Sequence, residues 1–156
     1  MKSSLYSKSF AKINLGLKIV NQRLDGYHNI SSIFIEIDLY DTIEFIESNH
    51  FSIKFNGIDV PMDDNNTVYK AIKLLSQIYK INITHKIVIN KKIPLGSGLG
   101  GGSSNAAQAL IGINKLYNLN ISKEKLLDIG NSIGKDVPFF LEGGVKQVEG
   151  TGDILK

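Results

Sequence analysis

The stretch that says most about the fold runs from Pro94 to Ala107 and reads PLGSGLGGGSSNAA. Five of the seven residues from Gly96 to Gly102 are glycine. Such a run is costly in chain entropy, but it lets backbone N–H groups converge on an anion with no Cβ in the way. The pattern predicts a strand from His85 to Asn90 before the loop and a helix rich in small residues after it. A glycine loop between a strand and a helix N-terminus is typical of a phosphate-binding site, because the helix end offers unpaired N–H donors and a positive dipole.

Other interpretations of this loop fit the sequence less well. A flexible linker would not require the flanking strand and helix or the Ser103-Ser104 pair, whose hydroxyls suit phosphate or Mg²⁺. A Walker loop requires a lysine after the last glycine, and Ser103 stands there instead. The residues from Gly96 to Gly101 match the dinucleotide fingerprint literally. That fingerprint requires a strand after the helix, whereas the next predicted element, beginning at Ser122, is another helix.

The rest of the chain divides into strands followed by helices. Apolar residues alternate with polar ones around Leu15 and around Ile35, which predicts two long half-buried strands. Asp64-Asn65-Asn66 can cap a helix that follows it. Phe139-Phe140-Leu141 is predicted to begin a final extended segment that runs to Val148. Strands and helices without regular alternation predict the α+β fold class.

Composition excludes several kinds of protein. The chain has 156 residues, which suits one domain, or one domain and a fragment of another. It has no cysteine, so disulfides, thiolate metal sites and thiol nucleophiles are excluded. Its only arginine is Arg23, and its histidines do not have metal-ligand spacing, so we expect neither a nucleic-acid partner nor a protein-built metal site. No apolar run approaches the ~18 residues that a membrane span needs. We therefore expect a cytoplasmic protein without a membrane partner.

The loop sequence resembles the phosphate-binding motif of the GHMP small-molecule kinases. Within that superfamily, AKINL from Ala11, RLDGYH from Arg23 and GKDVPFF from Gly134 are similar to the branch that phosphorylates cytidine diphospho-methylerythritol in the non-mevalonate isoprenoid pathway. The resemblance runs from about Lys12 to Leu155. It implies a GHMP kinase N-terminal domain, similar to the second domain of ribosomal protein S5. It also implies ATP, Mg²⁺ and transfer of a phosphoryl group to the 2-hydroxyl of that substrate.

Members of this family are considerably longer than this chain. The resemblance therefore implies that residues 1–156 are the N-terminal, ATP-binding domain and that the C-terminal domain is missing from this chain. It also implies two catalytic residues. Lys12 would position the acceptor and neutralise charge on the transferred phosphoryl group, and Asp136 would accept the proton of the attacking hydroxyl or orient that hydroxyl.

The resemblance assigns the remaining site residues as well. Asn14 would hydrogen-bond the substrate, Tyr27 would stack on its cytosine base and His28 would bond the edge of that base. Asn65 and Lys91 would approach the adenine of ATP. The other ATP-binding residues would be Pro94, Leu95, Gly96, Ser97, Gly98, Leu99, Gly100, Gly101, Gly102, Ser103, Ser104 and Asn105.

Simpler roles stay open for several of these residues. On sequence alone, Asp136 could be a turn or capping residue instead of a catalytic one. Asn65 could be a helix cap, and Lys91 could simply flank a strand. Two other functions also stay open. A GHMP kinase of the homoserine or mevalonate type would keep the loop without needing Tyr27 and His28. An RNA-binding module on the S5-like fold would use the lysines and not the loop.

Overall fold

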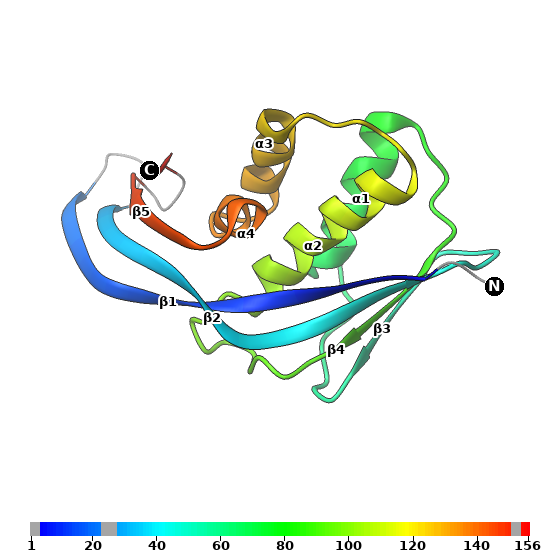
Figure 1. The fold of residues 1–156 in the computed structure, drawn as a ribbon, viewed down its shortest axis with the longest axis horizontal. Helices are drawn as coiled ribbons and strands as arrows, with labels where there is room; N and C mark the ends of the chain where they lie inside the picture. The colour runs from blue at the N-terminus through cyan, green and yellow to red at the C-terminus, as the bar shows by residue number, and fades with distance from the viewer. Residues whose placement is uncertain (1–3, 23–27, 151–153) are drawn as a thin grey trace.

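In the computed structural model, which describes residues 4–22, 28–150 and 154–156, helices cover one face of a twisted sheet (Figure 1). The strands are β1 (Leu5–Gln22), β2 (His28–Ile46), β3 (Ser52–Asn56), β4 (Lys86–Asn90), β5 (Val145–Glu149) and β6 (Ile154–Leu155). The helices are α1 (Thr67–Tyr79), α2 (Gly101–Leu116), α3 (Lys123–Ile133) and α4 (Val137–Glu142). This order confirms the α+β class. None of the helices in the described ranges is long and apolar enough to cross a membrane.

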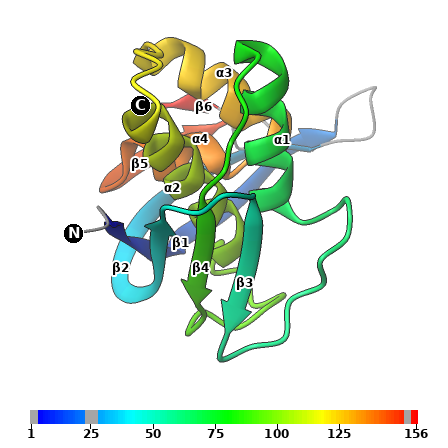
Figure 2. The same ribbon diagram turned by 90° about the vertical axis from the view of Figure 1, so that its right-hand side faces the viewer.

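The long strand β2 organises the sheet. One edge of β2 pairs antiparallel with β1. The other edge pairs with β5 through residues 32–35 and with β4 through residues 42–46. Strand β3 lies parallel to β4 at the far side, as Figure 2 shows. The strand order along this path is β3-β4-β2-β5-β6, and β1 lies off the path, paired with β2.

Helix α2 packs across the middle of the sheet. Its Ala106, Ala107, Leu110 and Ile113 are fully buried, as their spacing predicts. The close approach of α2 to β2 depends on Gly112, because a Cβ at that position would lie 2.3 Å from the ring of Phe45. The predicted apolar face of α1 is confirmed too, since Val68, Ala71, Ile72 and Leu75 are buried.

The alternating patterns predict strands correctly, but they do not say which face of each strand is covered. Leu15, Ile19 and Ile33 are 52%, 60% and 42% exposed. Lys12 and Phe34, on the opposite face, are only 5% and 2% exposed. Alternation shows which residues share a face, whereas the elements packed on the sheet decide which face is buried. Here the covered face carries a lysine.

The prediction of an extended segment at Phe139-Phe140-Leu141 is wrong, because these residues belong to helix α4. Residues 137–140 are all buried, so the sequence shows no amphipathic period there. A short apolar run of this kind is compatible with either a buried strand or a buried helix. Pro138 lies in the first helical turn, where its missing N–H costs nothing, and Gly143 ends the helix at a φ of 70°. The extended prediction is confirmed only for β5.

Candidate active site at the glycine loop

The glycine-rich segment joins β4 to α2 and lines a cavity of about 340 Å³. Thr67, Ser103 and Asp136 line the same cavity. The N-cap of α2 is Gly100, at a φ of 74°, and no side chain caps the helix. The first N–H groups of α2 are thus left for an anion, and the positive end of the helix dipole lies beside them.

Gly100 is required at its position by two independent constraints. Its positive φ is unfavourable for a residue that has a Cβ. A Cβ there would also lie 2.6 Å from the ring of Phe140 and 3.3 Å from Cγ of Lys12. The loop consequently passes directly over the side chains that form the rest of the site.

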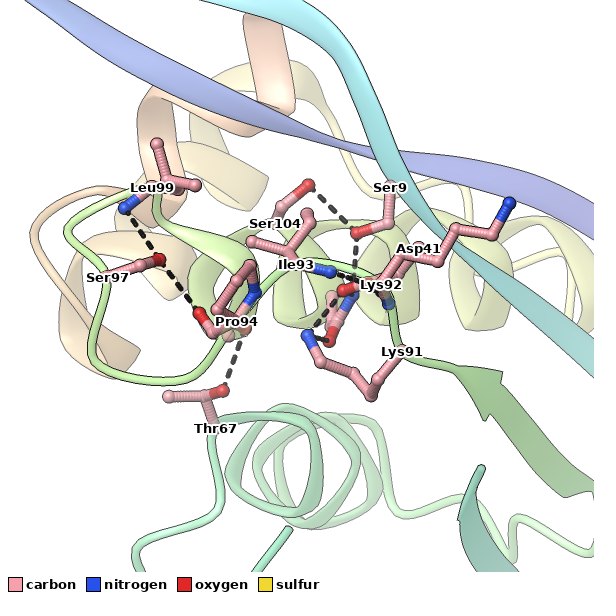
Figure 3. Close-up of polar contacts among 12 residues, drawn as sticks. Ser9, Asp41, Thr67, Lys91, Lys92, Ile93, Pro94, Ser97, Leu99 and Ser104 are labelled. Atoms are coloured by element: carbon pink, nitrogen blue, oxygen red, sulfur yellow. Dashed lines mark hydrogen bonds and ion pairs between the residues drawn. The ribbon is translucent and has the colours of Figure 1, made fainter. Parts of the chain in front are cut away.

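Hydrogen bonds within and around the loop hold it in place. The Ser97 hydroxyl donates to the Pro94 carbonyl at 2.8 Å and accepts from the Leu99 N–H at 3.4 Å (Figure 3). The Lys12 N–H donates to the Leu99 carbonyl at 2.9 Å, which fastens the loop to β1. Ser97 therefore supplies an internal brace where the loop would otherwise consist almost entirely of glycine and backbone.

Lys12, Asn14 and Asp136 lie together beside the loop. The Lys12 Nζ is 2.7 Å from Oδ1 of Asn14 and 3.6 Å from Oδ2 of Asp136. It also lies 4.4 Å from the centre of the Phe34 ring. The Lys12 side chain is 6% exposed and that of Asp136 is 33% exposed, so the carboxylate reaches the cavity while the ammonium lies behind it.

Of the two simpler interpretations of Asp136, the turn is confirmed, but the side-chain helix cap is not. Asp136 is the N-cap residue of α4, but its side chain makes no capping hydrogen bond. The carboxylate faces the Lys12 ammonium instead. A carboxylate and a buried ammonium beside an anion cradle form an arrangement that can orient a hydroxyl and stabilise developing phosphoryl charge.

Three residues predicted to contact ATP have their side chains beneath the loop. The Lys91 side chain is 1% exposed. Its ammonium donates hydrogen bonds to the Asp41 carboxylate and, at 3.0 Å, to Oδ1 of Asn105. The Ser104 hydroxyl accepts a hydrogen bond from Ser9 at 2.8 Å. The ammonium of Lys91 is thus bonded to protein partners, although the residue also lines the loop cavity, and its approach to adenine stays a prediction. The sequence shows which groups a side chain can bind, but not which protein group the fold places beside it.

The helix cap at the start of α1 is Asn66 and not Asn65. Oδ1 of Asn66 accepts from the N–H groups of Val68 and Tyr69, both at 3.1 Å. Asn65 is exposed, and its N–H donates to Oδ1 of Asp63 at 2.9 Å. Asn65 and Asn66 are the same residue type and so are equally good helix caps, and only the backbone geometry determines which of them caps α1. The adenine role of Asn65 stays a prediction.

Thr67 and Asp41 belong to the site region but were missed by sequence analysis. The Thr67 hydroxyl donates to the Gly102 carbonyl at 2.8 Å, which links α1 to the start of α2 (Figure 3). Asp41 is fully buried inside the continuous strand β2. No local signal in the sequence distinguishes these residues, because their partners lie far away along the chain.

The predicted substrate residues are only partly described. Tyr27 lies outside the described residues. His28 begins β2, and its side chain is also outside the description. Asn14 is the member of this group that the structure places, beside Lys12. The assignments of Tyr27 and His28 to the cytosine base stay predictions.

Comparison with known proteins agrees with this geometry. Residues 66–144 match the family described as GHMP kinases N terminal domain, and the chain belongs to that family. A 4-diphosphocytidyl-2-C-methyl-D-erythritol kinase of Enterococcus faecalis is 46% identical over 148 residues, which are 94% of this chain and 52% of that protein. The chain thus spans about half the length of the curated relatives it matches.

Solved structures give the same result. A crystal structure of 4-(cytidine 5'-diphospho)-2C-methyl-D-erythritol kinase superimposes with a TM-score of 0.83 and 35% identity, over 97% of this chain and 54% of that one. Mevalonate kinase of Methanococcus jannaschii shares the fold, with a TM-score of 0.75 and 18% identity over 99% of this chain and 55% of that one. The resemblance seen in the sequence motifs is therefore confirmed.

Proposed function

We propose that this chain forms the ATP-binding part of a kinase for 4-diphosphocytidyl-2-C-methyl-D-erythritol, which acts in the non-mevalonate isoprenoid pathway. The observation that carries the proposal is the ion pair of Lys12 and Asp136, 3.6 Å apart, beside the open N-terminus of α2. The choice of substrate rests on relatives that are 46% and 35% identical. Because those matches cover about half of each relative, we propose that residues 1–156 act as the N-terminal domain of the catalytic unit.

The proposed reaction is a direct in-line transfer. A bond forms between the acceptor hydroxyl oxygen and the γ-phosphorus of ATP, and the bond from that phosphorus to the β,γ-bridging oxygen breaks to release ADP. The loop N–H groups, the first N–H groups of α2 and the Ser103 hydroxyl hold the phosphates. Asp136 orients the acceptor hydroxyl and takes its proton as the new bond forms. Lys12, held by Asn14, stabilises the charge on the transferred group.

The oxygen donors of the cavity also fit a magnesium ion. The Ser103 hydroxyl and the Asp136 carboxylate line the same cavity, and Mg²⁺ prefers oxygen ligands together with phosphate. When bound with ATP, this ion would neutralise charge on the phosphates. Ser104 is not available for that role, because its hydroxyl is buried against Ser9.

The test is a mass-spectrometric turnover assay with Mg-ATP and the cytidine substrate. The protein used is a chimera in which this chain replaces the matching 52% of the Enterococcus faecalis kinase. We expect phosphorylated product from the chimera, and none from the same chimera carrying Asp136→Asn. Turnover of homoserine or mevalonate without the cytidine substrate would assign the chain to another GHMP kinase. Salt-sensitive RNA binding without any ATP binding would contradict the kinase proposal altogether.

A further inference from the structure

A fully buried ion pair lies beneath the glycine loop. The side chains of Asp41, on β2, and Lys91, just after β4, are 0% and 1% exposed. Removing two charges from water is costly, so a buried ion pair is weak as a source of net stability. A better-supported use of such a pair is to fix one geometry. The hydrogen bonds of these two residues show which segments the pair connects.

Asp41 holds both ends of the loop. Its Oδ1 accepts from the N–H groups of Lys92 at 2.6 Å and Ile93 at 2.9 Å, where the chain enters the loop (Figure 3). Its Oδ2 accepts from Lys91 Nζ and from Nδ2 of Asn105 at 3.0 Å. Asn105 lies in the first turns of α2, where the chain leaves the loop. One carboxylate thus joins the last residues before the loop to the helix that follows it.

The same network reaches the strand that carries Lys12. Asn105 Nδ2 donates to the Ser9 hydroxyl at 2.8 Å, and Ser9 donates to the Ser104 hydroxyl at 2.8 Å. Ser9 lies on β1, three residues before Lys12, whose N–H is bonded to the loop carbonyl of Leu99. The loop, α2 and β1 are therefore connected through buried polar contacts, and a buried network of this kind rigidifies the elements it joins.

We propose that Asp41 is a positioning residue for the phosphate loop, acting through Lys91 and Asn105. It sets the separation between the start of the loop and the N-terminus of α2, so that the N–H donors are arranged for a triphosphate before it binds. Donors that need no rearrangement bind more tightly, because no ordering cost falls on the binding step. This inference rests on the proposed function, since it takes the ligand of the loop to be ATP.

The test compares phosphate-dependent binding with phosphate-independent binding. Asp41→Asn keeps the shape of the side chain but removes the charge opposite Lys91. Asn105→Ala keeps the ion pair and breaks its link to α2. Calorimetry on the 156-residue chain measures the Kd of a non-hydrolysable ATP analogue and of adenosine. Nitrogen-15 relaxation measures the backbone order of Gly96, Gly98, Gly100, Gly101 and Gly102 without any ligand.

We expect both variants to raise the Kd of the ATP analogue about tenfold or more. The Kd of adenosine should stay unchanged, and the backbone order of the loop glycines should fall. The matched control is Glu142→Gln, which removes the two ion pairs that join α4 to Lys123 and Lys146 and leaves the loop untouched. It should change neither the Kd values nor the loop order. Asn105→Ala decides the question by itself if Asp41→Asn does not fold.

Unchanged backbone order of the loop in the folded variants would overturn the positioning role of Asp41. An equal rise in the Kd of adenosine and of the ATP analogue would overturn it too. The proposed function fails in a different way, when the unaltered chain binds no ATP analogue at all. The relaxation data still test the positioning role in that case, because they need no nucleotide.

Discussion

Lys12 is a buried cation with three different neighbours, namely Asn14, Asp136 and the ring of Phe34. Its burial has a chemical consequence, since a charge held in a water-poor site acts more strongly on a nearby phosphoryl group than one in bulk solvent. Asp136 is more exposed and so can meet a substrate hydroxyl. This difference in exposure supports the separate roles that we propose for the two residues of the ion pair.

We expect Lys12→Met and Asp136→Asn each to lower kcat of the chimera by about 10²- to 10⁴-fold, the usual range for loss of a positioned acid–base or charge-stabilising group. Affinity for the ATP analogue should change much less for Asp136→Asn, because in the proposed site the loop and α2 hold the phosphates. Steady-state kinetics and calorimetry measure the two effects, with circular dichroism as the control for folding. Turnover within a few-fold of the parent in both variants would contradict the assigned roles.

The loop glycines allow a matched comparison. Gly98 and Gly100 have φ values of 75° and 74°, but a Cβ at Gly98 would meet nothing within 4 Å, whereas one at Gly100 would meet Phe140. We expect Gly98→Ala to cost about 1 kcal/mol from backbone strain alone. Gly100→Ala should lower the free energy of unfolding by about 2–4 kcal/mol, since overpacking against Phe140 is added to that strain. Urea unfolding measures both, and equal costs would show that the contact with Phe140 is unimportant.

At the scale of single elements, the start of helix α1 separates a structural asparagine from a predicted binding one. Asn66→Ala should destabilise the chain by about 1 kcal/mol because it removes the helix cap. Asn65→Ala should change the free energy of unfolding by less than about 0.5 kcal/mol, as for an exposed residue. It should nevertheless weaken ATP-analogue binding if Asn65 approaches adenine. Unchanged affinity in Asn65→Ala would remove that residue from the site.

The junction of α3, α4 and β5 has a charge cluster that responds to pH. Glu142 contacts Lys123 at 2.6 Å and Lys146 at 2.9 Å. Hydrogen bonds from Lys123 and then Lys146 lower the pKa of Glu142 below its ordinary value. A lowered folded-state pKa means that the stability is present above the unfolded pKa of about 4.3 and is lost as the pH falls through the folded value.

Glu142→Gln should therefore reduce the free energy of unfolding at pH 7 by no more than about 1 kcal/mol, because Lys123 is largely exposed. As the pH falls from the unfolded pKa through the lowered folded-state pKa of Glu142, the difference between the variant and the parent should shrink, since the carboxyl is neutral in both states only below that folded value. Urea titrations at a series of pH values measure this. A difference that does not depend on pH would show that the carboxylate charge is not the cause.

At the scale of the whole molecule, ligand binding and stability are linked. A non-hydrolysable ATP analogue at about 100 times its Kd should stabilise the chain by about 2.7 kcal/mol. For a chain of this size that corresponds to a rise of roughly 5–10 °C in Tm. Calorimetric scans with and without the analogue measure the shift. A Tm that does not respond to the analogue in a folded chain would contradict ATP binding at the loop.

The sequence by itself determined a large part of this protein. The glycine run, the helix after it and the small residues Ala106 and Ala107 predict the anion cradle locally, because all of its parts are close together in the chain. The motifs around Lys12 and Asp136 led to the family, which the comparisons confirm. Short-range signals of this kind, including the cap at Ser122, need no knowledge of distant neighbours.

Only the tertiary structure decided the remainder, because those features depend on contacts between residues far apart in sequence. The packing of helices on one face of the sheet buries Lys12 and leaves Leu15 exposed, which alternation cannot foresee. Burial on all sides hides the helical period of α4. The 50 positions between Asp41 and Lys91 hide their ion pair. The local sequence indicates which atoms can interact, but only the tertiary fold determines which of them come into contact.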